Sequence, residues 1–154
     1  MCGISGFYSK TSSMFNNAIK NMNSAISHRG PDTDGVWIDK SSGVFFGHQR
    51  LSILDLSKAG NQPMVSHSER FVITYNGEIY NHLEIRNEIE KNGFSINWRG
   101  TSDTETLLQA IECWGIETTL KKILGMYAFV VWDKKKRSLL IARVRMGEKP
   151  IYFG

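Results

Sequence analysis

The chain has 154 residues, of which 41% are hydrophobic and 22% are charged. This length suits one domain with a conventional core, and the composition excludes a disordered or fibrous protein. The net charge of +4 is spread along the sequence except for a basic run at residues 134–137. That run is typical of a solvated hairpin turn, so we expect no nucleic-acid partner.

The two cysteines favour a reducing compartment and no metal centre. Cys2 and Cys113 are too far apart in the sequence to indicate a disulfide framework or a cysteine-ligated metal site. No basic leader precedes an apolar run, and no stretch approaches about eighteen apolar residues, which predicts neither a signal peptide nor a membrane span. We therefore expect a cytoplasmic protein with no membrane partner. Cys113 falls in a helical pattern and is interpreted as a small core residue.

The first half of the chain is predicted to contain a strand, a helix and a strand pair. Alternation over residues 4–8 predicts a short strand that holds the N-terminus. A helix is predicted from residue 13, ending before the Gly-Pro pair at residues 30–31. Residues 36–38 and 44–51 are predicted to pair across the turn at residues 41–43. The apolar positions of the helix are Met14, Ala18, Met22, Ala25 and Ile26.

The middle of the chain is predicted to form a strand followed by two helices. Residues 51–56 are expected to be extended and residues 57–64 to form a polar loop. A strand over residues 70–75 has Phe71, Ile73 and Tyr75 on one face and is predicted to end at the turn formers of residues 76–77. One helix follows a cap at Asn81 and ends at residues 92–93. The next opens with a capping box at residues 102–105 and runs to residue 114.

The last third is predicted to be mainly strands. A short helix is expected at residues 120–124, and residues 126–132 and 139–144 form a hairpin around the basic turn, with a further strand at residues 151–153. The long connections between hairpins indicate antiparallel sheets with helices packed outside, an α+β fold. We found no internal repeat or linker, so residues 1–154 are predicted to form one domain.

The second residue offers a nucleophile and a base together. Removal of Met1, usual before a small residue, would leave Cys2 with a thiol and a free α-amine on the same skeleton. A thiol titrates at about 8.5 and an α-amine at about 7.7–8.0, so near neutrality some amine is free to accept the thiol proton. The alternative interpretation is that Cys2 is only a small residue after the initiator.

Four polar segments interrupt apolar strands, at residues 28–32, 50–53, 76–78 and 102–103. Each has an ordinary explanation as a helix cap, a surface ion pair, a turn or a favourable charge at a helix start. Together they suit hydrolysis of a side-chain amide on a free amino acid. The Asn76 amide and the Gly77 N–H could bind an oxyanion, Arg50 an α-carboxylate and Asp103 an α-ammonium group. These roles match glutamine.

The whole chain resembles the N-terminal glutamine amidotransferase domain of asparagine synthetase, the class that uses an N-terminal cysteine. Seven segments carry the resemblance, in family order over nearly all the chain. They are MCGISG at residues 1–6, HRGPD at 28–32, GHQRLSI at 47–53, NQPM at 61–64, YNGEIYN at 75–81, SDTE at 102–105 and GEKPIY at 147–152.

The resemblance implies a fold and a set of residue roles. The fold is a four-layer αββα sandwich, two antiparallel sheets between helical layers, of the N-terminal nucleophile hydrolase type. Cys2 is implied as nucleophile, Asn76 and Gly77 as oxyanion hole, and Arg50 and Asp103 as glutamine ligands. The same resemblance implies that Leu51, Ile53 and Glu78 line the pocket and that Arg29 orients the N-terminus.

The resemblance also implies a partner domain that is absent from this sequence. The family domain hydrolyses L-glutamine without a cofactor and passes ammonia to a synthetase domain, which uses ATP and Mg²⁺ to activate aspartate. Relatives also amidate other carboxylates, so the acceptor stays open. A catalytically silent glutamine-binding domain is the alternative from another class. A different N-terminal nucleophile hydrolase is a weaker third option, against which Arg50 and Asp103 argue.

Two departures from the family pattern affect the expected domain coupling. Val144 and Met146 stand where the family usually carries Asp and Phe, in a stretch toward the synthetase half. The sequence ends at Gly154, where the family continues with a turn and a return strand, so we expect a sheet edge that lacks its last strands. An unpaired strand there would favour association into a homo-oligomer.

Overall fold

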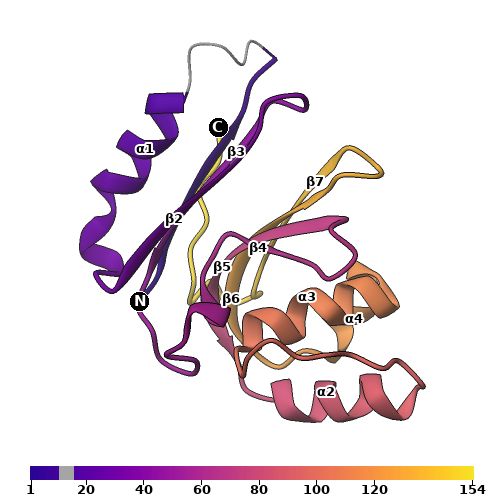
Figure 1. The fold of residues 1–154 in the computed structure, drawn as a ribbon. Coiled ribbons are helices and arrows are strands. Elements are labelled where there is room, and N and C mark those ends of the chain that lie inside the picture. Colours follow the sequence, from indigo (N-terminus) through magenta and orange to yellow (C-terminus); the bar gives the residue numbers. More distant parts are fainter. Residues whose placement is uncertain (11–15) are drawn as a thin grey trace.

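Two antiparallel sheets face each other in the computed structural model, which describes residues 1–10 and 16–154 (Figure 1). Strands that are neighbours in the two orders given next are hydrogen-bonded to each other. The first sheet has the order β1 (Gly3–Tyr8), β3 (Val44–Arg50), β2 (Thr33–Asp39). The second has the order β4 (Met64–Val65), β5 (Phe71–Ile79), β6 (Gly125–Asp133), β7 (Ser138–Arg143).

Helices cover the outer face of each sheet. Helix α1 (Asn16–Ala25) packs on β1 and β3, whereas α3 (Asp103–Trp114) packs on β5. Helices α2 (His82–Lys91) and α4 (Ile116–Lys122) pack against α3 (Figure 1). Two short 3₁₀ helices, η2 (Ser27–Arg29) and η3 (Lys58–Gly60), lie in the connections. The layers therefore run helix, sheet, sheet, helix, which confirms the predicted αββα sandwich.

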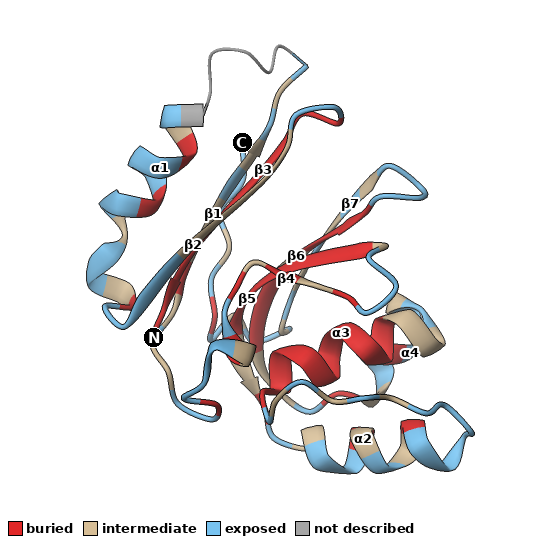
Figure 2. Ribbon diagram, viewed as in Figure 1, coloured by how far each residue is buried: buried red, intermediate tan, exposed pale blue. Residues whose placement is uncertain are grey.

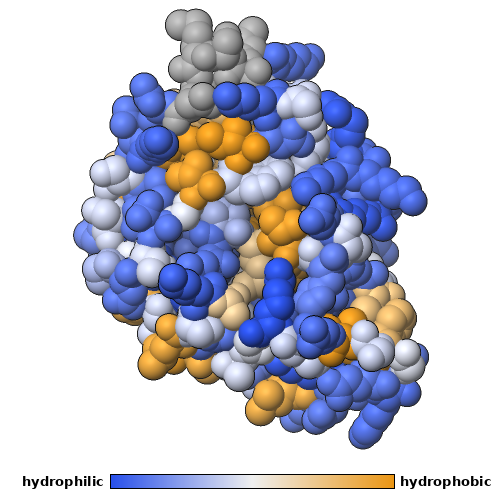
Figure 3. Space-filling model, in the orientation of Figure 1, coloured by the Kyte–Doolittle hydropathy of each residue, from blue (hydrophilic) through white to orange (hydrophobic). Residues whose placement is uncertain are grey.

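The alternation of strand side chains builds two apolar layers. Odd-numbered residues of β5, from Phe71 to Ile79, face α3 and α4, where they meet Leu107 and Ile111. Figure 2 shows this buried layer as red over the facing surfaces of the second sheet and α3. Even-numbered β5 residues face the first sheet, where Val72 packs with buried residues of β3 and β6. Figure 3 shows apolar side chains along the seam between the sheets, bordered by hydrophilic surface.

The predicted strand pairings and the predicted starts of α2 and α3 are confirmed, whereas α4 begins at Ile116, earlier than the helix expected at residues 120–124. Strands β2 and β3 pair, as do β6 and β7 around a turn at the basic residues 134–137. The Ser102 hydroxyl accepts from the backbone N–H of Glu105 at 3.2 Å, which is the first half of the predicted capping box. The Glu105 carboxylate does not return to Ser102 but accepts from the backbone N–H groups of Arg99 and Gly100.

Three predictions about secondary structure are wrong. The strand predicted over residues 70–75 does not end at residues 76–77 but continues to Ile79. The loop predicted over residues 57–64 contains η3 and the start of β4. Residues 151–153 form no strand, because no strand of the described chain pairs with them.

The buried face of α1 also differs from the predicted one. Ile19 and Asn23 are buried, whereas Met22 is 39% exposed. Asn23 occupies the apolar side because its Nδ2 donates to the carbonyls of Gly35 and His48, at 3.3 and 3.2 Å. The predicted start of this helix, with Met14, lies outside the described residues.

Helices capable of crossing a membrane are absent from residues 1–10 and 16–154, since none is both long and apolar enough. In the same described ranges, no group of three or more His, Cys, Asp or Glu side chains is placed to hold a metal ion.

Candidate active site

Cys2 lies at the start of β1, beside the end of β3. Its Sγ accepts from the backbone N–H of Leu51 at 3.4 Å and lies 3.6 Å from the Leu51 carbonyl. Pairing of Gly3 with Gln49 sets this position, because it brings the residue before β1 to the strand end that carries Arg50 and Leu51. The half-buried thiol therefore faces the polar segment that follows β3.

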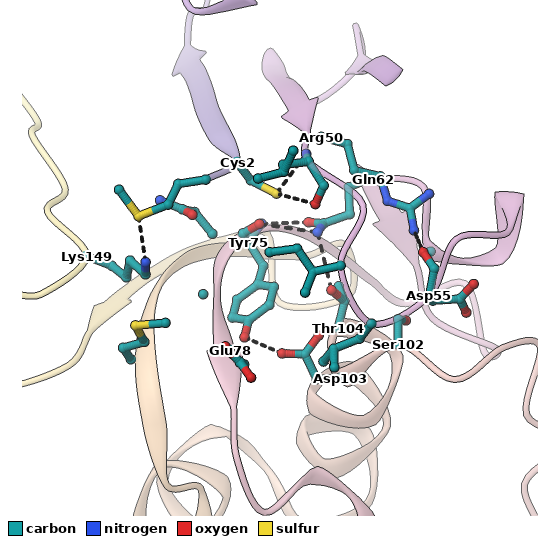
Figure 4. Close-up of a pocket in the computed structure, with 18 residues that line it drawn as sticks. Cys2, Arg50, Asp55, Gln62, Tyr75, Glu78, Ser102, Asp103, Thr104 and Lys149 are labelled. Carbon is teal, nitrogen blue, oxygen red and sulfur yellow. Dashed lines mark hydrogen bonds between the residues drawn. The ribbon is translucent and has the colours of Figure 1, made fainter. Parts of the chain in front are cut away.

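A cavity of about 110 Å³ opens in front of Cys2, between the two sheets and the start of α3 (Figure 4). Eight of the nine residues predicted for the site line it: Cys2, Arg50, Leu51, Ile53, Asn76, Gly77, Glu78 and Asp103. Arg29 is the exception. Its Cβ lies 3.1 Å from where a side chain on Gly3 would start, so it packs behind the first strand.

Asn76 faces the cavity because β5 is a strand through residues 76–79 rather than a turn. As an even-numbered residue of β5, its side chain points toward the first sheet, on the same face as Thr74, whose Oγ1 donates to Gly47 of β3. The Asn76 side chain is 6% exposed, and its amide has no hydrogen-bond partner among the described residues. An amide donor is thus free on the cavity wall.

The backbone N–H of Gly77 faces the open edge of β5. Gly77 pairs with Tyr127 of β6, but the Tyr127 carbonyl accepts from Val144 beyond β7, so the Tyr127 backbone faces away from β5. The pair therefore exchanges no hydrogen bonds, and the Gly77 N–H points to the opposite edge. The neighbouring edge N–H groups, of Tyr75 and Ile79, are held there by side-chain oxygens of Gln62 and Asp103.

Arg50 is buried, and part of its guanidinium is hydrogen-bonded to the loop that follows it. Its Nη1 donates to the Ser57 carbonyl at 2.9 Å and to Asn61 Oδ1 at 2.8 Å, and its Nη2 donates to the Asp55 carbonyl. The Nε–H and one Nη2 hydrogen have no hydrogen-bond partner among the described residues. A guanidinium with free donors on both Nε and Nη2 can bind a carboxylate.

Asp103 is the first residue of α3 and is held from two directions. Its Oδ2 accepts from the Tyr75 hydroxyl at 2.6 Å and from the Ile79 N–H at 2.9 Å. Burial, together with the charge of Asp103, raises the pKa of Tyr75 well above its usual value, so the hydroxyl stays protonated and donates. The second carboxylate oxygen, Oδ1, has no hydrogen-bond partner among the described residues.

Leu51, Ile53 and Glu78 complete the predicted set on the cavity wall. Ile53 is 66% exposed, so it lies at the rim. Six further lining residues lie in segments that carry the resemblance but have no site role predicted from the sequence: Met1, Gln62, Tyr75, Ser102, Thr104 and Lys149. Lys149 is buried, and its ammonium donates to the Met1 thioether at 2.8 Å (Figure 4).

Comparison with known families agrees with this geometry. The family model described as "Glutamine amidotransferase domain" matches residues 1–154. The chain belongs to the glutamine amidotransferase domain family. The matched range includes both sheets, the residues that line the cavity, and Cys2.

Curated relatives of this glutamine amidotransferase domain are longer proteins. Asparagine synthetase [glutamine-hydrolyzing] 1 of Bacillus subtilis (strain 168) is 41% identical over 157 residues, covering 99% of this chain and 24% of that protein. Asparagine synthetase [glutamine-hydrolyzing] 3 of the same organism is 37% identical, with 99% and 25% covered. Amidase chry2 of Gibberella zeae is 34% identical over 128 residues, with 83% and 18% covered. The chain therefore spans a quarter or less of each of these three relatives.

Proposed function

We propose that this domain hydrolyses L-glutamine to glutamate and ammonia through a γ-glutamyl thioester on Cys2. The observation that carries the proposal is one cavity that gathers Cys2, the free donors of the Asn76 side chain and the Gly77 backbone, and a guanidinium and a carboxylate with free hydrogen-bonding capacity. Family membership supports the substrate. The donor pair suits an oxyanion, and the charged groups suit the two ends of a free amino acid.

Met1 must be removed before any reaction, because the Cys2 nitrogen must be an amine to act as a base. The amine takes the thiol proton, and the sulfur attacks the γ-carbonyl carbon of glutamine. The oxyanion that forms accepts from the Asn76 amide and the Gly77 N–H. Breakage of the carbon–nitrogen bond, with the proton returned from the amine, releases ammonia and leaves the thioester. Water then attacks the thioester, releasing glutamate and restoring the thiol.

Arg50 and Asp103 are proposed to fix the α-carbon of glutamine. The free Nε–H and Nη2–H of Arg50 would bind the α-carboxylate, and Oδ1 of Asp103 the α-ammonium group. Leu51, Ile53 and Glu78 are proposed to line the pocket around the substrate, consistent with their positions on the wall. Arg29 is proposed to orient the N-terminus, in agreement with its packing beside Gly3.

Ammonia is proposed to pass to a synthetase domain, for asparagine formation. The supporting fact is that the asparagine synthetases matched by the chain are much longer than the chain. ATP and Mg²⁺ would act in that domain, and none of the steps above uses a cofactor. One relative bears the name of an amidase and not of an asparagine synthetase, so we leave the acceptor open. We place the reaction in the cytoplasm, where a free nucleophilic thiol persists.

The competing function, a silent glutamine-binding domain, is favoured by one feature of the site. With Met1 attached, the Cys2 nitrogen is an amide, and the Met1 sulfur occupies the cavity wall in contact with Lys149. A chain that kept Met1 would bind glutamine without hydrolysing it.

Glutamine hydrolysis by the purified domain tests the proposal. The domain lacking Met1 should form glutamate and ammonia in equal amounts. Cys2→Ala should abolish this activity while calorimetry still detects glutamine binding, because Arg50 and Asp103 are unchanged. Cys113→Ala is the matched control and should keep the wild-type rate. Hydrolysis that survives in Cys2→Ala, or none in the wild type without Met1, would contradict the proposed function.

A further inference from the structure

Gln62 lies on the cavity wall with all its hydrogen-bonding groups engaged. The side chain comes from the loop between η3 and β4, and the residue is 7% exposed. Its Oε1 accepts from the Tyr75 N–H at 2.7 Å, and its Nε2 donates to the Tyr75 carbonyl at 3.2 Å and to Thr104 Oγ1 at 3.3 Å. Figure 4 shows the amide between Tyr75 and Thr104. One side chain thus joins β5 to the first turn of α3.

The Gln62 side chain replaces a strand at this edge. Strand β4 pairs Met64 with Ile73, so a continued ladder would place the backbone of residue 62 opposite Tyr75. The backbone leaves the ladder instead and passes close to Gly35 of β2: a Cβ on Gly35 would lie only 2.0 Å from the Gln62 carbonyl oxygen, so no side chain would fit there. The side-chain amide makes both bonds to Tyr75 that a strand would have made.

Because no strand among the described residues continues along this edge of β5 beyond β4, the next backbone N–H after that of Tyr75 has no strand partner. Along the free edge of β5 the N–H groups of Tyr75, Gly77 and Ile79 follow at intervals of two residues. Gln62 holds the first and Asp103 the third, at 2.7 and 2.9 Å. The N–H between these two bonds, that of Gly77, is the one that faces the cavity.

We propose that Gln62 is a positioning residue, which fixes the Tyr75–Asn76 peptide and so aims the two oxyanion donors at the substrate. This inference rests on the proposed glutaminase function. Gln62 would not touch the reacting atoms itself. Because Asp103 keeps its bonds from Tyr75 and Ile79, the loss should fall on turnover more than on substrate binding.

A double-mutant cycle separates positioning from simple structural support. Gln62→Met keeps the length of the side chain and removes its hydrogen bonds. We expect kcat to fall by about tenfold or more and KM to change by less than about threefold. In the Asn76→Ala background the same substitution should lower kcat by less than about threefold, because a donor that Gln62 aims is already gone. An equal loss of kcat in both backgrounds would overturn the proposal.

Gln109→Met is the matched control, since Gln109 is a buried glutamine of α3 that lies outside the cavity. This variant should keep the wild-type kcat even if it lowers stability. A loss of kcat equal to that of Gln62→Met would mean that the effect comes from general destabilisation and would overturn the proposal.

Amide hydrogen exchange provides a readout independent of activity. In Gln62→Met the Tyr75 amide should exchange at least about tenfold faster, whereas the Thr74 amide, which faces β6, should not change. An unchanged exchange rate of the Tyr75 amide would contradict the positioning role of Gln62, whatever the kinetics show. If the wild type hydrolysed no glutamine, the proposed function would fail, and the Tyr75 amide alone would decide whether Gln62 holds this edge.

Discussion

Gly77 illustrates how one residue can satisfy two physical demands. A side chain there would meet the Met126 carbonyl oxygen at 2.4 Å and the Tyr127 Cα at 2.8 Å, so glycine is required for β5 to approach β6. Its N–H points to the opposite edge, toward the cavity. The sequence predicted an oxyanion-binding N–H at Gly77, and the structure adds the close approach to β6.

Asn76→Ala tests the neighbouring donor. We expect kcat to fall by about a hundredfold or more with little change in KM, because the amide would bind the oxyanion and not the ground-state substrate. Steady-state glutaminase kinetics measure this directly. Asn23→Ala, which removes another buried asparagine outside the cavity, should lower stability without lowering kcat. An unchanged rate in Asn76→Ala would rule out the oxyanion role.

At the residue scale, chemistry made most of the candidate site predictable. A nucleophile beside an α-amine, a guanidinium and a carboxylate each have a definite use, so Cys2, Arg50 and Asp103 could be identified from their types and surrounding motifs. Gln62 could not, because an amide that bonds only to backbone and a hydroxyl has no signature in the sequence. Its motif, NQPM, belongs to the segments that carry the resemblance, but no role was predicted for it.

At the element scale, tertiary partners overrode local signals. An Asn-Gly pair favours a two-residue hairpin when the flanking strands pair with each other. Strand β5 pairs instead with β6, which begins at Gly125, so the chain stays extended through Asn76 and Gly77. Residues 151–153 show the converse case, because β-prone residues form a strand only where a partner completes the ladder. Pairing with a distant strand is not visible in a local pattern.

At the scale of the whole molecule, the site exists only because the two sheets meet. The first sheet brings Cys2 and Arg50, the second brings Asn76 and Gly77, and α3 brings Asp103. Periodicity predicted the class of fold and most of the elements. Local turn signals predicted the two hairpins, whereas contacts between elements far apart in the chain followed only from the resemblance, since no local signal records them.

The burial of His48 between the two sheets should make the stability of the fold depend on pH. The residue is fully buried between β3 and β5, where its Nε2 lies 3.0 Å from the Tyr75 carbonyl. A carbonyl only accepts, so Nε2 carries the hydrogen. Burial, reinforced by the charge of Arg50, lowers the pKa of His48 to about 4 although the bond to Tyr75 opposes the shift.

Acid should therefore destabilise the fold well above the range in which carboxylates titrate. Between about pH 6.5 and pH 4 the unfolded chain binds a proton at residue 48 that the folded chain does not, so each unit of acidification removes about 1.4 kcal/mol from the free energy of unfolding, up to about 3 kcal/mol in total. Urea unfolding at successive pH values measures this slope. The slope should be smaller in His48→Gln and unchanged in the control His28→Gln, at an exposed residue. Equal slopes in wild type and His48→Gln would contradict the assignment.

The central claim is that Cys2, freed of Met1, is the nucleophile of a glutamine-shaped pocket. Intact mass spectrometry before and after incubation with an electrophilic glutamine mimic tests it most directly. We predict loss of the Met1 mass, then addition of one label that peptide mapping places on Cys2 and not on Cys113, with excess glutamine slowing the labelling. A chain that has lost Met1 and takes up no label at Cys2, or takes it up equally at Cys113, would contradict the claim.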